Sequence, residues 1–196
     1  MGTIRVSGLV AESIVDGKGM RFVVFCQGCP HHCPGCHNPD THDFDGGREV
    51  QLEEIVGSIA QNPMLQGVTF SGGEPFCQAA AFAELARMLR ALPGRRLDLM
   101  VYSGWTYEQL TEKAKAEPAV GELLRLCDTL MDGPFLMAQR DLTLRYRGSR
   151  NQRHIDLMRT RMSGRVVLVE ESSGYSRVRY LRGGARSWNV RSGLHF

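Results

Sequence analysis

The chain has 196 residues and a net charge of +3, with 42% hydrophobic and 23% charged residues. This is ordinary globular composition, which argues against disordered and fibrous proteins, and the length fits one core. No apolar run approaches the roughly 20 residues that a membrane-spanning helix needs. Six cysteines would suit a small secreted disulfide scaffold, but residues 1–5 begin no apolar signal run, so we expect a cytoplasmic protein with no membrane partner.

Short runs rich in Val, Leu, Phe and Ile alternate with segments of helical period, which predicts an α/β fold of parallel strands joined by crossover helices. The predicted strands are residues 4–9, 21–25, 67–70, 97–102, 129–131 and 166–169. Helices are predicted at 49–61 and 78–91, where apolar residues recur on one stripe. A third helix is predicted to begin at Thr106, because residues 106–109 form a capping-box pattern.

Four cysteines lie within eleven residues after the second predicted strand: Cys26, Cys29, Cys33 and Cys36. One short loop cannot bury four thiols against different partners, so we expect them to face a shared metal centre. The last three have the spacing C-x-x-x-C-x-x-C, which suits a 4Fe-4S cluster with one iron left open to a substrate. With Cys26 included, two C-x-x-C pairs arise, and a structural zinc site with four thiolates is the alternative.

A second motif, Ser-Gly-Gly-Glu-Pro at residues 71–75, follows the strand predicted at 67–70. Its glycines, Gly72 and Gly73, allow backbone to approach a ligand closely, and exposed carbonyls there accept hydrogen bonds from a charged amine. A Gly-Gly turn at a strand end is also common for purely structural reasons. Its position one crossover after a cysteine loop favours the functional interpretation.

These motifs, with His37 and Asn38 directly after the last clustered cysteine, resemble the radical S-adenosylmethionine superfamily and its short glycyl-radical activating enzymes. Segments at 102–108, 131–135 and 147–153 are similar to those of activators of anaerobic, class III ribonucleoside-triphosphate reductases. The resemblance covers residues 1–170 and implies an incomplete, TIM-like βα barrel with its site at the carboxyl ends of the strands. The predicted strands agree, because each motif directly follows one.

The resemblance implies three ligands for the 4Fe-4S cluster: Cys29, Cys33 and Cys36. S-adenosylmethionine would chelate the fourth iron. Cys26 is then spare, and we expect a buried free thiol there. Cys77 and Cys127 lie in helical patterns and are predicted to be core residues. Gly35 stands where many members of the superfamily have an aromatic residue.

The residues that the resemblance places around the cofactors are Gly35, Cys36, His37, Gly72, Gly73, Glu74, Ser103 and Asp132. His37 is expected to face the adenine. Gly73 and Glu74 are expected to hold the methionyl amine, through backbone rather than the acid. Ser103 and Asp132 are candidates for binding the ribose or carboxylate, with the alternative that they only cap strand-to-helix turns.

The implied activity is reductive cleavage of S-adenosylmethionine to methionine and a 5'-deoxyadenosyl radical, which abstracts hydrogen from a glycine of the reductase large subunit. No catalytic side chain is needed beyond the cluster and cosubstrate, and reduced flavodoxin or ferredoxin is the expected electron donor. The alternatives are an activator of the pyruvate formate-lyase type, a radical enzyme acting on a small molecule, and a zinc-stabilised binding module. Asn151 and Gln152, in a segment specific to the reductase activators, are expected near the site.

From Arg159 onward eight arginines accompany two glutamates, so the end of the chain is a basic appendage. No Lys/Arg run or nucleic-acid module accompanies it, and nucleic acid is not an expected ligand. We divide the chain into an activating-enzyme core at 1–170 and a basic C-terminal extension at 171–196, interpreted as a hairpin or a segment that contacts the partner.

Overall fold

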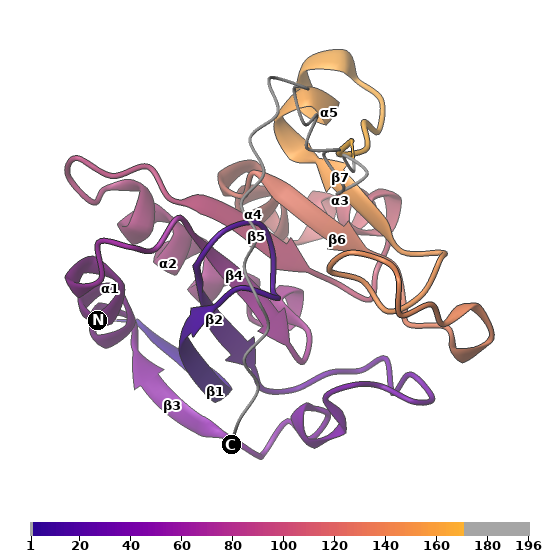
Figure 1. Cartoon of the computed structure of the whole chain (residues 1–196), viewed down its shortest axis with the longest axis horizontal. Helices are drawn as coiled ribbons and strands as arrows, with labels where there is room; N and C mark the ends of the chain where they lie inside the picture. Colours follow the sequence, from indigo (N-terminus) through magenta and orange to yellow (C-terminus); the bar gives the residue numbers. More distant parts are fainter. Residues whose placement is uncertain (1, 171–196) are drawn as a thin grey trace, which may run out of the picture.

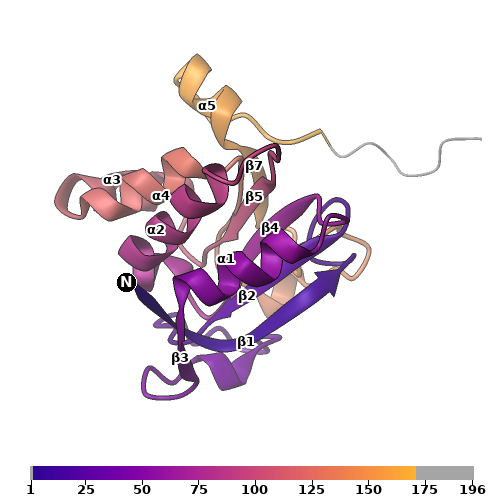
Figure 2. The same ribbon diagram turned by 90° about the vertical axis from the view of Figure 1, so that its left-hand side faces the viewer.

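The computed structural model describes residues 2–170. Its centre is a seven-stranded sheet with strand order β3-β1-β2-β4-β5-β6-β7, with helices gathered on one face (Figures 1 and 2). This arrangement confirms the α/β class. No helix among the described residues is long and apolar enough to span a membrane. The predicted basic extension at 171–196 lies outside the described residues.

Four neighbouring strands of the sheet run parallel: β2 (Arg21–Cys26), β4 (Gly67–Gly72), β5 (Asp98–Tyr102) and β6 (Thr129–Asp132). The helices of their connections are α1 (Leu52–Gln61), α2 (Ala79–Arg90), α3 (Tyr107–Ala116) and α4 (Pro118–Leu126). Three short 3-10 helices lie in loops: η1 (Pro39–Thr41), η2 (Pro75–Gln78) and η3 (Met137–Gln139). Because parallel strands all point the same way, their four carboxyl ends meet at one edge of the sheet.

The edges of the sheet differ from the prediction of parallel strands. β1 (Thr3–Ser13) pairs antiparallel with β2 and with β3 (Arg48–Gln51), and β7 (Arg153–Asp156) pairs antiparallel with β6. Residues 49–51 were expected to begin a helix, but they pair with β1 instead. β7 has no apolar run to reveal it. Of the strand predicted at 166–169, only Leu168 is paired, through a single bridge to Ile155 of β7. Helix α5 (Leu157–Ser163) lies between these two residues in the chain.

Helix boundaries follow local sequence signals. Thr106 caps α3 as predicted: its side chain accepts from the backbone N–H of Gln109, whose side chain accepts in return from Thr106 N. Pro118 at the first position of α4 separates this helix from α3, since proline fits a first turn but not a helix interior. The sequence interpretation did not resolve α4 as a helix of its own.

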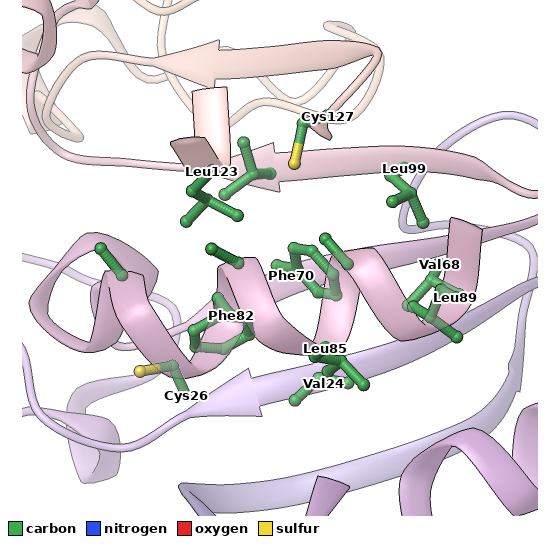
Figure 3. Packing of buried hydrophobic residues seen from close by; sticks show 14 of the residues in the cluster. Val24, Cys26, Val68, Phe70, Phe82, Leu85, Leu89, Leu99, Leu123 and Cys127 are labelled. Atoms are coloured by element: carbon green, nitrogen blue, oxygen red, sulfur yellow. The ribbon is translucent and has the colours of Figure 1, made fainter. Parts of the chain in front are cut away.

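The core lies between the sheet and helices α1 to α4, and Figure 3 shows its part around α2. Phe82, Leu85 and Leu89 share one stripe of α2 and are fully buried, as their helical spacing predicts. Phe82 packs against Phe70 of β4 with ring centroids 5.0 Å apart.

Two cysteines outside the cluster loop test the core prediction. Cys127 is buried there as predicted. Cys77 is exposed, so its assignment to the core was wrong. It lies in η2, before the apolar stripe of α2 begins.

Candidate functional site

A cavity of about 440 Å³ lies at the carboxyl edge of the four parallel strands. Side chains alternate between the two faces of a strand, so Val24 and Phe70 face the helices while Phe25 and Ser71 line the cavity. The loop that follows each parallel strand contributes to the lining. This placement matches the prediction that the motifs gather at one edge.

The three predicted cluster ligands, Cys29, Cys33 and Cys36, all line this cavity. All three are free thiols; Cys29 is buried and the other two are partly exposed. The backbone of the loop is anchored where Gly28 N donates to Thr41 O at 2.9 Å. Burial raises the pKa of the Cys29 thiol to about 11, with nearby acidic groups contributing less. Metal binding must therefore displace a proton there.

The donor set fits a cluster better than a single metal ion. Within residues 2–170, no group of three or more His, Cys, Asp or Glu side chains converges closely enough to hold one ion. A structural zinc site needs all its ligands around one atom, whereas the thiolates of a cuboidal cluster bind different irons and stand farther apart. Three free thiols on one cavity wall suit the second arrangement.

Cys26 faces away from the cluster loop's cavity. It is fully buried in the core, and its sulfur lies 3.1 Å from Gln78 Nε2 and 3.6 Å from the carbonyl oxygen of Glu74. Burial raises the pKa of this thiol well above its usual range. The prediction of a buried free thiol is confirmed, and the four-thiolate zinc site loses its fourth ligand.

The paired glycines hold the cysteine loop against the end of β4. Gly73 N donates to Cys26 O and Glu74 N donates to Gly28 O, each at 2.8 Å. A Cβ on Gly72, whose φ is +90°, would lie 2.7 Å from Cys26 N, and one on Gly73 would lie 2.4 Å from Gly28 O. Glycine is therefore required here by the approach of the chain's own backbone. Both glycines also line the cavity.

The side chain of Glu74 does not line the cavity. It is completely buried and accepts from Ser103 Oγ at 3.0 Å, Gly104 N at 2.8 Å and Phe76 N at 3.1 Å. His31 Nε2 lies 2.7 Å from the same carboxylate. Ser103, by contrast, does line the cavity.

Asp132 also lies outside the cavity lining, although Gly133 beside it contributes. Its buried carboxylate accepts from Tyr107 N at 2.7 Å and from Arg153 Nε at 3.0 Å. Those bonds join β6 to the start of α3 and to β7. Two interpretations of Asp132 were open: binding of the cosubstrate, or capping of a strand-to-helix turn. These contacts support the capping role.

The loop between β6 and β7 contacts the cysteine loop at Gly35 and His37. His37 lines the cavity with its ring centroid 5.1 Å from that of Phe135. Gly35 does not line it: a Cβ there would lie 2.0 Å from Met137 Cε, and its φ is +74°. Met137 therefore occupies the space beside the position where many superfamily members have an aromatic residue.

Gln152 and Asn151 organise the same loop. Gln152 lines the cavity as expected, accepts from Gly148 N at 2.9 Å and donates to Gly133 O at 3.1 Å. Asn151 donates to Pro134 O at 2.8 Å from behind the lining.

Several lining residues were not anticipated from the sequence. Val15 and Asp16 come from the loop between β1 and β2, Tyr102 ends β5, and Tyr146 lies in the loop between β6 and β7. The Tyr102 hydroxyl donates to the carbonyl of Tyr146, a non-glycine residue with φ of +61°. Tyr102 belongs to the segment 102–108 that carries part of the resemblance, whereas no motif or spacing marks Val15, Asp16 or Tyr146.

Comparisons with known proteins agree with this site. The family model described as a 4Fe-4S single cluster domain matches residues 15–155. The anaerobic ribonucleoside-triphosphate reductase-activating protein of Haemophilus influenzae is 31% identical over 146 residues, covering 71% of this chain and 89% of the relative. The protein of the same name from Escherichia coli K12 is 31% identical, with 71% and 90% covered.

A pyruvate formate-lyase-activating enzyme of Clostridium pasteurianum is 37% identical over a shorter stretch of 91 residues, which covers 44% of this chain and 38% of the relative. The reductase activators match over most of their own length, and the family model spans the cysteine loop, the paired glycines and the β6–β7 loop. The chain therefore belongs to the 4Fe-4S single cluster domain family, together with the anaerobic ribonucleoside-triphosphate reductase-activating proteins.

Proposed function

We propose that the chain is a glycyl-radical-generating activating enzyme whose protein substrate is an anaerobic ribonucleoside-triphosphate reductase. Its cofactors are a 4Fe-4S cluster and S-adenosylmethionine, as in the radical enzymes it resembles. One observation carries the proposal: three free thiols and the paired-glycine turn line a single cavity at the carboxyl ends of four parallel strands. That cavity, about 440 Å³, has the size of a small-molecule site.

We assign the cluster to Cys29, Cys33 and Cys36, which leaves one iron without a protein ligand. When bound, the cluster supplies the electron that breaks the sulfonium carbon–sulfur bond of the cosubstrate. Reduced flavodoxin or ferredoxin is the proposed electron donor, and the cytoplasm the proposed compartment.

The chain's own residues bind and orient the cosubstrate. Backbone at Gly72 and Gly73 is the proposed contact for the methionyl amine, because both glycines line the cavity. His37 and Ser103 present side chains to the same space, and we keep them as contacts for the nucleoside. Gly35, Glu74 and Asp132 act from outside the lining, through the loops that they hold.

We propose an incomplete βα barrel as the architecture behind this site. Support comes from four parallel strands with crossover helices on one face and a cavity lined by the residues that face the other way. Barrel enzymes place their chemistry at the carboxyl ends of such strands. The antiparallel strands β1 and β7 flank the four parallel ones.

A protein substrate is supported by apolar side chains beside the cavity. Ile14 and Leu142 are 74% and 76% exposed, and their neighbours Val15 and Leu144 line the cavity itself. Exposed apolar side chains that are grouped on one surface mark sites that bind another protein, and we propose that these four residues form such a surface. We call Ile14, Val15, Leu142 and Leu144 the apolar rim.

A second candidate is the activation of a pyruvate formate-lyase-type enzyme. The partial match to the Clostridium pasteurianum enzyme favours it. The chemistry would be unchanged, and only the protein that enters the cavity would differ.

The test is to purify the chain anaerobically, reconstitute it with iron and sulfide, reduce it with S-adenosylmethionine, and measure 5'-deoxyadenosine with and without a candidate reductase. We expect product, and a glycyl radical signal on the reductase. Product with radical transfer only to a formate-lyase-type partner would establish the second candidate. Absence of product from a fully reconstituted protein would contradict both.

A further inference from the structure

Glu74 is a buried carboxylate at the meeting point of three loops that surround the cavity. Its Oε2 accepts from Gly104 N at 2.8 Å and from Ser103 Oγ at 3.0 Å, in the loop after β5. The same oxygen lies 2.7 Å from Nε2 of His31, in the cysteine loop. Its Oε1 accepts from Phe76 N at 3.1 Å, in η2.

His31 is the residue of the cysteine loop whose side chain contacts the Glu74 carboxylate. It lies between Cys29 and Cys33, and its ring packs edge-on against Trp105 with centroids 4.6 Å apart. A Cβ on Gly104 would lie 2.3 Å from Cδ2 of His31, so only a glycine leaves room for the ring. The histidine is thus seated between the β5 loop and the buried carboxylate.

From these contacts we propose, resting on the function proposed above, that Glu74 is a positioning residue that fastens the cysteine loop to the ends of β4 and β5 through His31. A buried carboxylate is costly unless its partners satisfy it, and a satisfied network holds one arrangement of the groups around it. In this chain the Glu74 network holds the part of the cysteine loop that places Cys29 and Cys33 at the cavity. The acid of the paired-glycine motif therefore orders the ligand loop, while the glycines beside it face the cavity.

The network requires an acid and not its amide. A carboxylate only accepts, so every described partner of Glu74, His31 included, donates to it. Two of these donors are backbone N–H groups, of Gly104 and Phe76, that cannot turn into acceptors. In Glu74→Gln, either orientation of the amide points its NH2 group at one of these N–H groups. The mutation thus creates an unsatisfied buried pair of donors, which is unfavourable.

The experiment compares the full chain with Glu74→Gln, His31→Phe and the double variant by hydrogen exchange, before and after cluster reconstitution. His31→Phe keeps a ring against Trp105 and removes the bond to Glu74, at a side chain that also lines the cavity. We expect amides in residues 27–37 of the cluster-free chain to exchange about tenfold faster in each single variant, as loss of a charge-assisted hydrogen bond predicts. The double variant should exchange no faster than Glu74→Gln, because both changes break one connection.

Asp132→Asn is the matched control, because Asp132 is equally buried and also accepts a backbone N–H. It should speed exchange around α3 and β7 and leave residues 27–37 within twofold of wild type. After reconstitution, Glu74→Gln should raise the KM for S-adenosylmethionine more than it lowers kcat. It should also alter the paramagnetic resonance spectrum of the reduced cluster with cosubstrate bound.

Unchanged exchange of residues 27–37 in His31→Phe would overturn the proposal, even if Glu74→Gln fails to fold. A loosened loop with wild-type spectrum and KM would also overturn it, since Glu74 would then stabilise the fold without positioning the ligands. These outcomes are distinct from failure of the proposed function, which shows in the wild-type chain as absence of 5'-deoxyadenosine.

Discussion

Cys26 and Cys29 stand three residues apart and have different surroundings. Cys26 belongs to the last position of β2 and points into the core, where Gln78 contacts its sulfur. Cys29 belongs to the loop and lines the cavity. The change from strand to loop between them separates a packing thiol from a ligand thiol.

Replacing each clustered cysteine by alanine should therefore divide them into two classes. We expect the rate of S-adenosylmethionine cleavage to fall at least about 100-fold in Cys29→Ala, Cys33→Ala and Cys36→Ala. Each of these variants lacks one thiolate that would bind the cluster, and no other cysteine among the described residues lines the cavity to replace it. Cys26→Ala should keep activity within about threefold and lose roughly 1–2 kcal/mol of stability from the small void it leaves. The measurements are 5'-deoxyadenosine formation, iron content and urea unfolding. Loss of iron in Cys26→Ala would contradict the assignment.

Cys127 gives the folded chain a dependence on alkaline pH. Burial raises the pKa of this thiol well above its usual range, whereas an unfolded thiol titrates near 8.5. The folded state holds the thiol proton more tightly than the unfolded state does. The contribution of Cys127 to the free energy of unfolding is therefore complete below about pH 8.5 and is lost as the pH rises further.

We expect the unfolding free energy to fall with pH above about 8.5 less steeply in Cys127→Ala than in wild type, by up to about 1.4 kcal/mol per pH unit. Cluster-free protein unfolded in urea at pH 7 to 10 provides the measurement. Equal slopes in the two proteins would show that Cys127 is not the group responsible.

At the scale of elements, Arg153 connects β7 to β6 and to α3. Its guanidinium contacts both oxygens of Asp132, and it lies 2.7 Å from Glu108. Asp132 is buried while the Glu108 side chain is 59% exposed. The hydrogen bond from Arg153 lowers the pKa of Glu108 below its usual range.

Arg153→Lys should destabilise the chain by about 1–3 kcal/mol, because lysine cannot make the two-pronged contact that satisfies a buried carboxylate. Glu108→Gln, on the exposed side of the same arginine, should cost less than about 1 kcal/mol. Urea unfolding of both variants tests the contrast. Equal losses of stability in the two variants would mean that the burial of Asp132 does not determine how much the Arg153–Asp132 ion pair stabilises the fold.

The strands also show which parts of the sheet the sequence patterns predict and which parts they miss. Runs of apolar residues predicted the four parallel strands within a few residues, because strands buried on both faces are nearly continuously apolar. β3 and β7 are edge strands of four residues with charged side chains. Their pairing partners, β1 and β6, define them, and no local pattern does.

At the scale of the whole molecule, Leu142 of the apolar rim allows the proposed partner binding to be tested apart from cosubstrate cleavage. Leu142→Asp should lower glycyl radical formation on the reductase about tenfold, because it places a charge on the surface that the partner would cover. Uncoupled cleavage of S-adenosylmethionine should stay within twofold of wild type, since Leu142 does not line the cavity.

Met162→Asp is the control for this prediction. Met162 is 80% exposed on α5, and no residue of α5 lines the cavity. Both activities of this variant should match wild type. A fall in radical transfer equal to that of Leu142→Asp would remove the rim from the docking surface.

The sequence by itself determined the chemistry and the class of fold. The spacing of three cysteines, the paired glycines and the strands before them predicted which loops share a site, and Cys29, Cys33, Cys36, Gly73 and Ser103 do line one cavity. Such signals are local: a ligand spacing, a turn that demands glycine, an apolar run. They can be read without knowing what lies across the fold.

Only the tertiary structure decided what each polar side chain does. Glu74 and Asp132 follow strand ends as ligand-binding residues would. Their carboxylates are nevertheless satisfied by partners that lie 21 or more residues away in the chain: His31, Ser103, Tyr107 and Arg153. The sequence shows that a carboxylate reaches the edge of the sheet. Whether that carboxylate faces the cavity depends on hydrogen-bond donors from other segments of the fold. A buried carboxylate must be hydrogen-bonded, so its orientation follows the position of those donors.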